Sequence, residues 1–150
     1  MTTTPQTADR RTARRGFTLT ELMVVTTLIG VMAAMSVPSF QRAVEQSRVD
    51  IAVANLRAVW AAERLYWLEH RAYAPDLTSL QAFGLLDPAV VTTTLGYVYA
   101  VQAAAENTFT AAATRAGSNA WTGALVVDDS GALSGLVSAL GEPMIVPGFQ

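Results

Sequence analysis

The chain of 150 residues contains no cysteine and no lysine, and only 15% of its residues are charged. The missing cysteines exclude a disulfide framework and any thiolate metal site, although they leave the cellular compartment open. The only histidine, His70, has no second imidazole with which to share a metal ion. Because the sequence also lacks a phosphate-binding loop, a nucleophile elbow and a His-Glu-x-x-His motif, we expect that the protein is not an enzyme.

Charge is distributed unevenly along the chain. Residues 1–16 hold four arginines against one acid, whereas the residues after Arg71 hold six acids against Arg115 alone. The acidic balance of the C-terminal part would repel phosphates, so we expect no direct nucleic-acid binding there. With 51% apolar residues, the composition is typical of one small globular domain joined to a membrane anchor.

A long uncharged segment begins directly after Glu21. Residues 22–41 are 20 uncharged residues in a row, which as a helix cover about 30 Å, the thickness of a bilayer's hydrocarbon core. The positive charge before this segment predicts that the N-terminus stays cytoplasmic and that residues after Gln41 face outward. An isolated carboxylate in such a segment costs about 2.5 to 3.5 kcal/mol. The sequence therefore predicts that Glu21 meets a partner.

Three interpretations compete for the basic stretch and the apolar run. A secretory signal peptide ending at Ala33 and a twin-arginine signal beginning at Arg14 both fit poorly with a carboxylate at Glu21 and with the length of the segment. The third interpretation takes the glycine, the phenylalanine, the acid and the long helix together as Gly16-Phe17-Thr18-Leu19-Thr20-Glu21-Leu22. This run resembles the class III signal of type IV prepilins and pseudopilins, in which a basic leader ending in Gly precedes Phe-Thr-Leu-x-Glu-Leu.

The resemblance implies a processing pathway and a set of partners. A prepilin peptidase would cut between Gly16 and Phe17, remove the leader of residues 1–16 and methylate the new amine of Phe17. The implied partners are copies of the chain and other pilins in a filament, the inner-membrane assembly platform, and the membrane before assembly. The implied location is the bacterial inner membrane, as a single-pass precursor, and then an extracellular pilus or a periplasmic pseudopilus. Adhesion and twitching motility are functions of the pilus class.

Cleavage would place an ammonium group at Phe17, four residues before Glu21, so that both charges lie at one end of the apolar helix. Two pairings then remain open. The charges pair within one chain in the membrane, or Glu21 of an incoming subunit pairs with Phe17 of its neighbour, which the resemblance implies for a filament. Because an unpaired buried charge is expensive, the second pairing would set the axial register of assembly.

Two residues mark soft points in the same helix. Pro38 has no amide hydrogen and clashes with the carbonyl four residues earlier, while Gly30 lowers helix propensity. We expect either an ordinary proline kink, which membrane helices tolerate, or, as the resemblance implies for assembled pili, a region that unwinds.

The pattern becomes amphipathic after Gln41, and one helix is predicted to continue to about residue 71. The predicted buried stripe is Val44, Ile51, Ala54, Ala58, Ala62 and Leu65, with charged residues, including Glu45, largely on other faces. The aromatic residues of this helix are predicted to pack in or around a core rather than to form a cofactor cage: Trp60, Tyr66 and Trp67.

Beyond the helix, residues 72–94 are predicted to form a linker with a short helix capped near Asp76. Four strands separated by turn formers are predicted at residues 95–102, 108–115, 122–128 and 133–137, and residues 138–150 form a tail that we expect to secure the sheet. Asp128 and Asp129 are weak candidates for Ca²⁺, because two adjacent acids before Ser-Gly more often form a hairpin turn, and the sequence does not supply the six or more oxygen ligands that such a site needs. We expect no other cofactor.

These observations predict an α+β pilin fold: residues 17–41 form a transmembrane and filament-core helix, and residues 42–150 form a head in which a helix packs on a four-stranded antiparallel sheet. The expected function is that of a structural subunit of a type IV pilus-like filament. The alternatives are a type II secretion pseudopilin and, in a different class, a single-pass anchored binding domain that does not polymerise.

Overall fold

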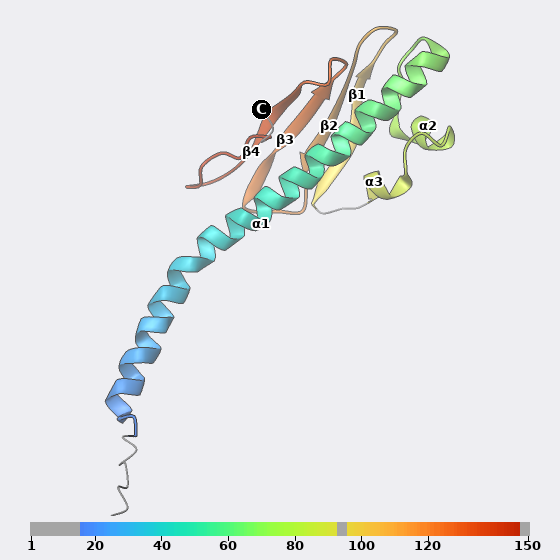
Figure 1. Ribbon diagram of the computed structural model, residues 1–150. Coiled ribbons are helices and arrows are strands. Elements are labelled where there is room, and N and C mark those ends of the chain that lie inside the picture. Colours follow the sequence, from blue (N-terminus) through green and yellow to red (C-terminus); the bar gives the residue numbers. More distant parts are fainter. Residues whose placement is uncertain (1–15, 93–95, 148–150) are drawn as a thin grey trace, which may run out of the picture. The chain divides into compact units, whose positions relative to one another are not determined.

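The computed structural model describes residues 16–92 and 96–147 (Figure 1). Within these residues, three helices precede four strands: α1 (Leu19–His70), α2 (Leu77–Ala82), α3 (Pro88–Thr92), β1 (Tyr97–Ala104), β2 (Phe109–Arg115), β3 (Trp121–Asp128) and β4 (Leu133–Ala139). The predicted leader before Gly16, the predicted strand start at Leu95 and the last three residues of the tail lie outside the described residues.

The chain divides into two compact units, residues 1–40 and residues 41–150. The first unit contains the N-terminal part of α1, which is helical from Leu19 onward and passes through Gly30 and Pro38 without an interruption in the helix. The second unit, which we call the head, contains the remainder of α1 and all the other helices and strands of the described residues.

The four strands form one antiparallel sheet in the order β1-β2-β3-β4. Each strand is joined to the next by a short turn, as expected when turn-forming residues separate β-branched runs. The structure therefore confirms the predicted α+β fold, with strand ends shifted from the predicted positions by at most two residues. In Figure 1 the head part of α1 runs along this sheet.

The face of α1 that packs on the sheet differs from the predicted one. Ile51 is 38% exposed, Leu65 is 52% exposed and Ala54 is also exposed, so the predicted stripe is wrong at these three positions. The buried face lies about one position away on the helix wheel and consists of Glu45, Val49, Ala52, Val53, Leu56, Val59, Ala62 and Glu63. The predicted and the observed stripe both recur at three- and four-residue intervals. The observed stripe contains two carboxylates, Glu45 and Glu63, so by sequence pattern it resembles a polar face.

Smaller elements close the rest of the core. The Asp76 side chain accepts a hydrogen bond of 2.7 Å from the amide of Ser79, which confirms the predicted cap of α2. In the tail, Ile145 is buried and exchanges two backbone hydrogen bonds with Val137 of β4, at 2.9 and 2.8 Å. The tail thus secures the open edge of the sheet, as expected from its apolar residues.

Candidate functional site

The junction between Gly16 and Phe17 lies in an exposed segment just before α1. Residues 16–18 are not helical, and α1 begins at Leu19. Phe17 is 82% exposed, and apart from Gly16 and its two chain neighbours no atom of the described structure lies within 4 Å of the place where a Cβ on Gly16 would stand. An exposed, non-helical peptide bond is the form of backbone that a protease can bind.

Glu21 and Thr18 form a capping box at the start of α1. The Glu21 carboxylate accepts hydrogen bonds of 3.1 Å from both the amide and the hydroxyl of Thr18, through the same oxygen, Oε2. In return, the Thr18 hydroxyl oxygen accepts a hydrogen bond of 3.2 Å from the amide of Glu21. This reciprocal pattern satisfies amides that the first turn of a helix otherwise leaves unpaired, and the negative charge also suits the helix N-terminus.

The capping box supplies a partner that the sequence reasoning missed. A Thr-x-x-Glu spacing just before an apolar run is a known signature of a helix start, and Thr18-Leu19-Thr20-Glu21 carries it. In the uncut chain the nitrogen of Phe17 is an amide, so pairing between a Phe17 ammonium and Glu21 stays a prediction. Among the described residues, the Glu21 contacts use only Oε2, which leaves Oε1 available to a new donor.

The N-terminal part of α1 presents apolar side chains on all its sides. Leu19, Leu28, Ile29, Met32 and Phe40 are each between 58% and 76% exposed. Of the described helices, only α1 is long and apolar enough to cross a membrane, and its most apolar window has no residue buried inside the chain. A helix that is apolar all round needs lipid or other helices to cover it.

The weak metal candidates occupy a hairpin turn between β3 and β4. The Asp128 carboxylate accepts hydrogen bonds from the amides of Ser130 and Ala132, at 2.9 and 3.0 Å, and from the Ser130 hydroxyl. These hydrogen bonds hold the pKa of Asp128 below its usual value, with that from the Ser130 hydroxyl the largest cause. The backbone carbonyl of Asp129 accepts a hydrogen bond from the Trp60 indole. Within residues 16–92 and 96–147, no three His, Cys, Asp or Glu side chains cluster as metal ligands would.

His70 and the aromatic residues of α1 make packing contacts. The His70 ring stacks on Tyr66 with a centroid separation of 4.1 Å and meets the edge of Phe83 at 4.8 Å. The Trp67 indole donates to the carbonyl of Glu106 at 2.7 Å. These contacts join the C-terminal end of α1 to α2 and to the β1-β2 turn.

A buried ion pair joins the head part of α1 to the sheet, and nothing in the sequence pattern predicted it. Arg115 donates to the two Glu45 oxygens at 2.6 and 3.1 Å, and the two side chains are 4% and 1% exposed. The Tyr97 hydroxyl donates to Glu45 at 3.2 Å, and Arg115 also donates to the carbonyl of Gly96 at 2.7 Å. Burial and then the charge of Glu45 raise the pKa of Tyr97, so its hydroxyl keeps the proton it donates.

Glu63 is a second buried carboxyl on the same face of α1. One oxygen accepts a hydrogen bond of 2.8 Å from the amide of Ala74, and the other has no partner among the described residues. Burial raises the pKa of Glu63 to about 7, and the Ala74 amide offsets part of this rise.

Comparison with known proteins places the junction inside a recognised motif. Residues 11–37 match the family described as the prokaryotic N-terminal methylation motif. The chain is 36% identical over 73 residues to the type II secretion system core protein G of Pseudomonas aeruginosa, which covers 49% of this chain and 51% of that protein. It is 38% identical over 60 residues to the type IV major pilin protein PilA of Myxococcus xanthus, which covers 40% of this chain and 27% of that protein.

A further similarity is to the type IV major pilin protein PilE of Neisseria gonorrhoeae, at 34% identity over 68 residues, with 45% of this chain and 41% of that protein covered. The chain thus spans about half the length, or less, of the curated relatives that it matches.

Proposed function

We propose that this chain, whose N-terminal part is similar to type IV pilins and a type II secretion pseudopilin, is a structural subunit of a type IV pilus-like filament. The subunit polymerises through its apolar N-terminal helix after a prepilin peptidase has cut between Gly16 and Phe17. The observation that carries this proposal is the position of Glu21: a carboxylate in the first turn of a membrane-length helix, beside an exposed and non-helical Gly16-Phe17 bond.

Cleavage changes the donors available to Glu21. In the uncut chain the carboxylate is held by Thr18, which fixes the start of the helix two residues after the scissile bond. Cutting that bond adds an ammonium group at Phe17 and leaves Oε1 of Glu21 to accept it, from the same chain or from a neighbour. Inside a bundle of apolar helices an unpaired charge costs several kcal/mol, so subunits that add in the wrong register are rejected.

The apolar surface of the helix supplies the driving force for assembly. Its side chains are covered by lipid while the subunit is in the membrane and by neighbouring helices in the filament, with the heads facing outward. This arrangement requires the membrane before assembly, copies of the chain or other pilins, the peptidase and an assembly platform. It places the precursor in the bacterial inner membrane with its N-terminus in the cytoplasm.

A pseudopilin of a type II secretion system is the second candidate. The observation that favours it is the similarity to core protein G, which covers more of this chain than the similarity to either pilin described above. Both candidates share the leader, the cleavage and the apolar helix, and they differ in whether the filament leaves the cell.

Electron microscopy of sheared surface material, with its principal protein band identified by mass spectrometry, separates these functions. A pilus subunit is expected as the main component of surface filaments at its natural expression level. A pseudopilin is expected in cross-linked oligomers of the cell envelope, without surface filaments. An anchored binding domain would be found in neither, and that result would contradict the proposed function.

The register argument is tested with Glu21→Ala. We expect this variant to be cleaved normally but to enter filaments about tenfold less, because removal of the carboxylate leaves the Phe17 ammonium buried without a partner. Thr18→Val is the matched control, because it removes the hydroxyl of the capping box and keeps the carboxylate. If Thr18→Val assembles as poorly as Glu21→Ala, helix capping explains the effect and the register argument fails.

A further inference from the structure

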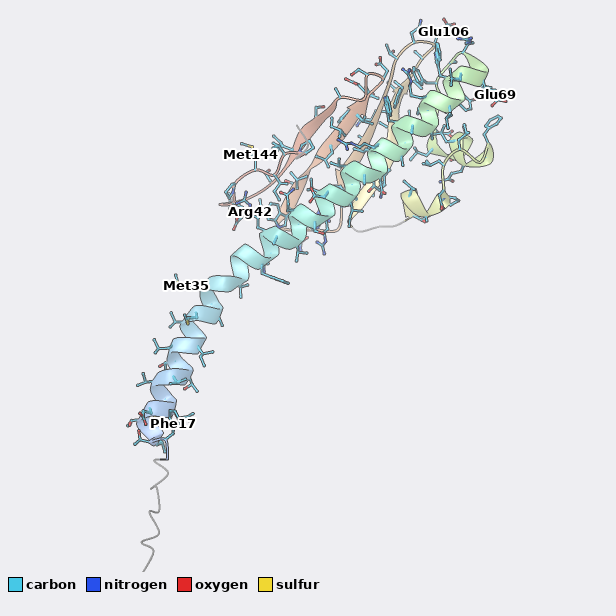
Figure 2. All side chains as sticks on the ribbon, viewed as in Figure 1. Phe17, Met35, Arg42, Glu69, Glu106 and Met144 are labelled. Carbon is cyan, nitrogen blue, oxygen red and sulfur yellow. The ribbon has the colours of Figure 1, made fainter. Side chains whose placement is uncertain are left out.

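The turn after β4 lies at the end of the sheet that Glu45 of α1 contacts. Arg115, the last residue of β2, binds Glu45 of α1, and it pairs with Tyr97, the first residue of β1. Trp121, the first residue of β3, pairs with Ala139, the last residue of β4. The turn that follows Ala139 therefore lies at the end of the sheet that Glu45 contacts. Figure 2 labels Met144 and Arg42 at this same end of the head.

This turn presents large apolar side chains to solvent. Leu140 is 104% exposed, Met144 is 63% exposed and Val146 is 58% exposed. The segment is nevertheless held in place, because Ile145 between them is buried and bonded to Val137. We call residues 140–146 the apolar turn. An ordered segment that holds Leu and Met outside the core needs something apolar to contact.

Along the chain, the head begins at Gln41, directly after the predicted membrane span. Gln41 is the last of the uncharged residues, and Glu45 follows it by one helical turn, which is about 6 Å of rise. The headgroup region on each side of a bilayer is about 5 to 8 Å thick. The strand ends that contact Glu45 are therefore within reach of the lipid headgroups.

The charges of the head agree with this placement. The opposite end of the sheet carries three acids, Glu106, Asp128 and Asp129. At the Glu45 end, the β2-β3 connection of residues 116–120 carries no acid and the apolar turn carries only Glu142. On α1 at this end, Arg48 is paired with Glu45, and Arg42, next to the predicted span, favours contact with anionic lipids.

We propose that the apolar turn docks on the outer surface of the membrane that the chain spans, with Leu140 and Met144 inserted at the boundary between headgroups and acyl chains. This contact would hold the head on the lipid surface before assembly. When the subunit leaves the membrane, the apolar turn would become exposed. The proposal depends on the membrane span and not on polymerisation. The docking can therefore fail while the proposed filament function holds, and the filament function can fail while the docking holds.

The absence of cysteine makes a direct test straightforward. The full uncut chain carrying Leu140→Cys is labelled with a polarity-sensitive fluorophore and placed, one chain per nanodisc, in phosphatidylcholine and phosphatidylglycerol. Nitroxides attached to the acyl chain near the headgroup quench a fluorophore that sits at this depth. Asn107→Cys, exposed in the β1-β2 turn at the opposite end of the sheet, is the matched control. Val31→Cys reports whether the span has inserted.

We expect several-fold stronger quenching at Leu140→Cys than at Asn107→Cys, with a blue-shifted emission only at the former, and the same result for a label at Met144→Cys. Equal quenching at Leu140→Cys and Asn107→Cys, with Val31→Cys quenched by nitroxides deep in the acyl region, would overturn the proposal. A blue shift that appears only with two chains per nanodisc and without lipid quenching would assign the turn to a second copy instead. An unquenched Val31→Cys would overturn both the span and the docking.

Discussion

The ion pair between Glu45 and Arg115 gives the sharpest prediction about the head. Arg115→Met removes the cation and keeps most of the side-chain volume, so the main change is a buried carboxylate that has lost its bidentate partner. Breaking a buried pair in this way usually costs about 3 to 5 kcal/mol of unfolding free energy. We expect a value near 3 kcal/mol, because Arg48, which lies 3.2 Å from Glu45, stays as a partly exposed second cation.

The loss is measured by urea unfolding of the full chain in detergent, followed by the fluorescence of the three tryptophans. Combining Glu45→Leu with Arg115→Met should recover part of the loss, because no charge is then left buried. The control is Arg64→Met, an exposed arginine of α1, which should change the unfolding free energy by less than about 0.5 kcal/mol. A loss of under 1 kcal/mol for Arg115→Met, as at a surface pair, would refute the argument.

Two further predictions concern the head. The Glu63 pKa is raised from 4.5 to about 7 in the folded chain, so between these pH values the folded state binds more protons than the unfolded state and stability falls as pH rises. About 3 kcal/mol present below pH 4.5 should be lost above pH 7; Glu63→Gln should flatten this slope in urea unfolding, and an unchanged slope would refute the assignment. Gly96→Ala should cost at least about 2 kcal/mol, because the backbone φ is +86° and the new Cβ would meet the guanidinium of Arg115. Gly117 has a φ of +68° and open space around it, so Gly117→Ala should lose only the unfolding free energy that the positive φ costs. Equal losses in the two variants would contradict this reasoning.

The long helix and the sheet could be predicted from the sequence because each has a strong local pattern. Uniform apolarity before Gln41, turn formers between the strands and an Asp cap before α2 all act locally, so they can be interpreted without tertiary information. The short helix α3 was missed, although Asp87 before Pro88 is a cap followed by a favoured first residue, and the Asp87 carboxylate does accept a hydrogen bond from Ala89.

The buried face of α1 could not be predicted in the same way. Glu45 is buried because Arg115, 70 residues later, donates two hydrogen bonds to it, and Glu63 is buried because the amide of Ala74 meets it. Such partners are set by the tertiary fold, so a carboxylate on an apolar stripe is easily mistaken for a solvent-facing residue. At the N-terminal site, cleavage between Gly16 and Phe17 and the pairing of Glu21 with Phe17 stay predictions. The hydrogen bonds between Thr18 and Glu21 are local, and the Thr-x-x-Glu spacing predicts them.

The most direct test of the central claim is the intact mass of the chain extracted from the cell envelope, with and without an active prepilin peptidase. A filament subunit of this family should begin at Phe17 and carry one added methyl group when the peptidase is active. In its absence the chain should keep residues 1–16 and an unmodified N-terminus. Retention of residues 1–16 in cells with an active peptidase would contradict the account.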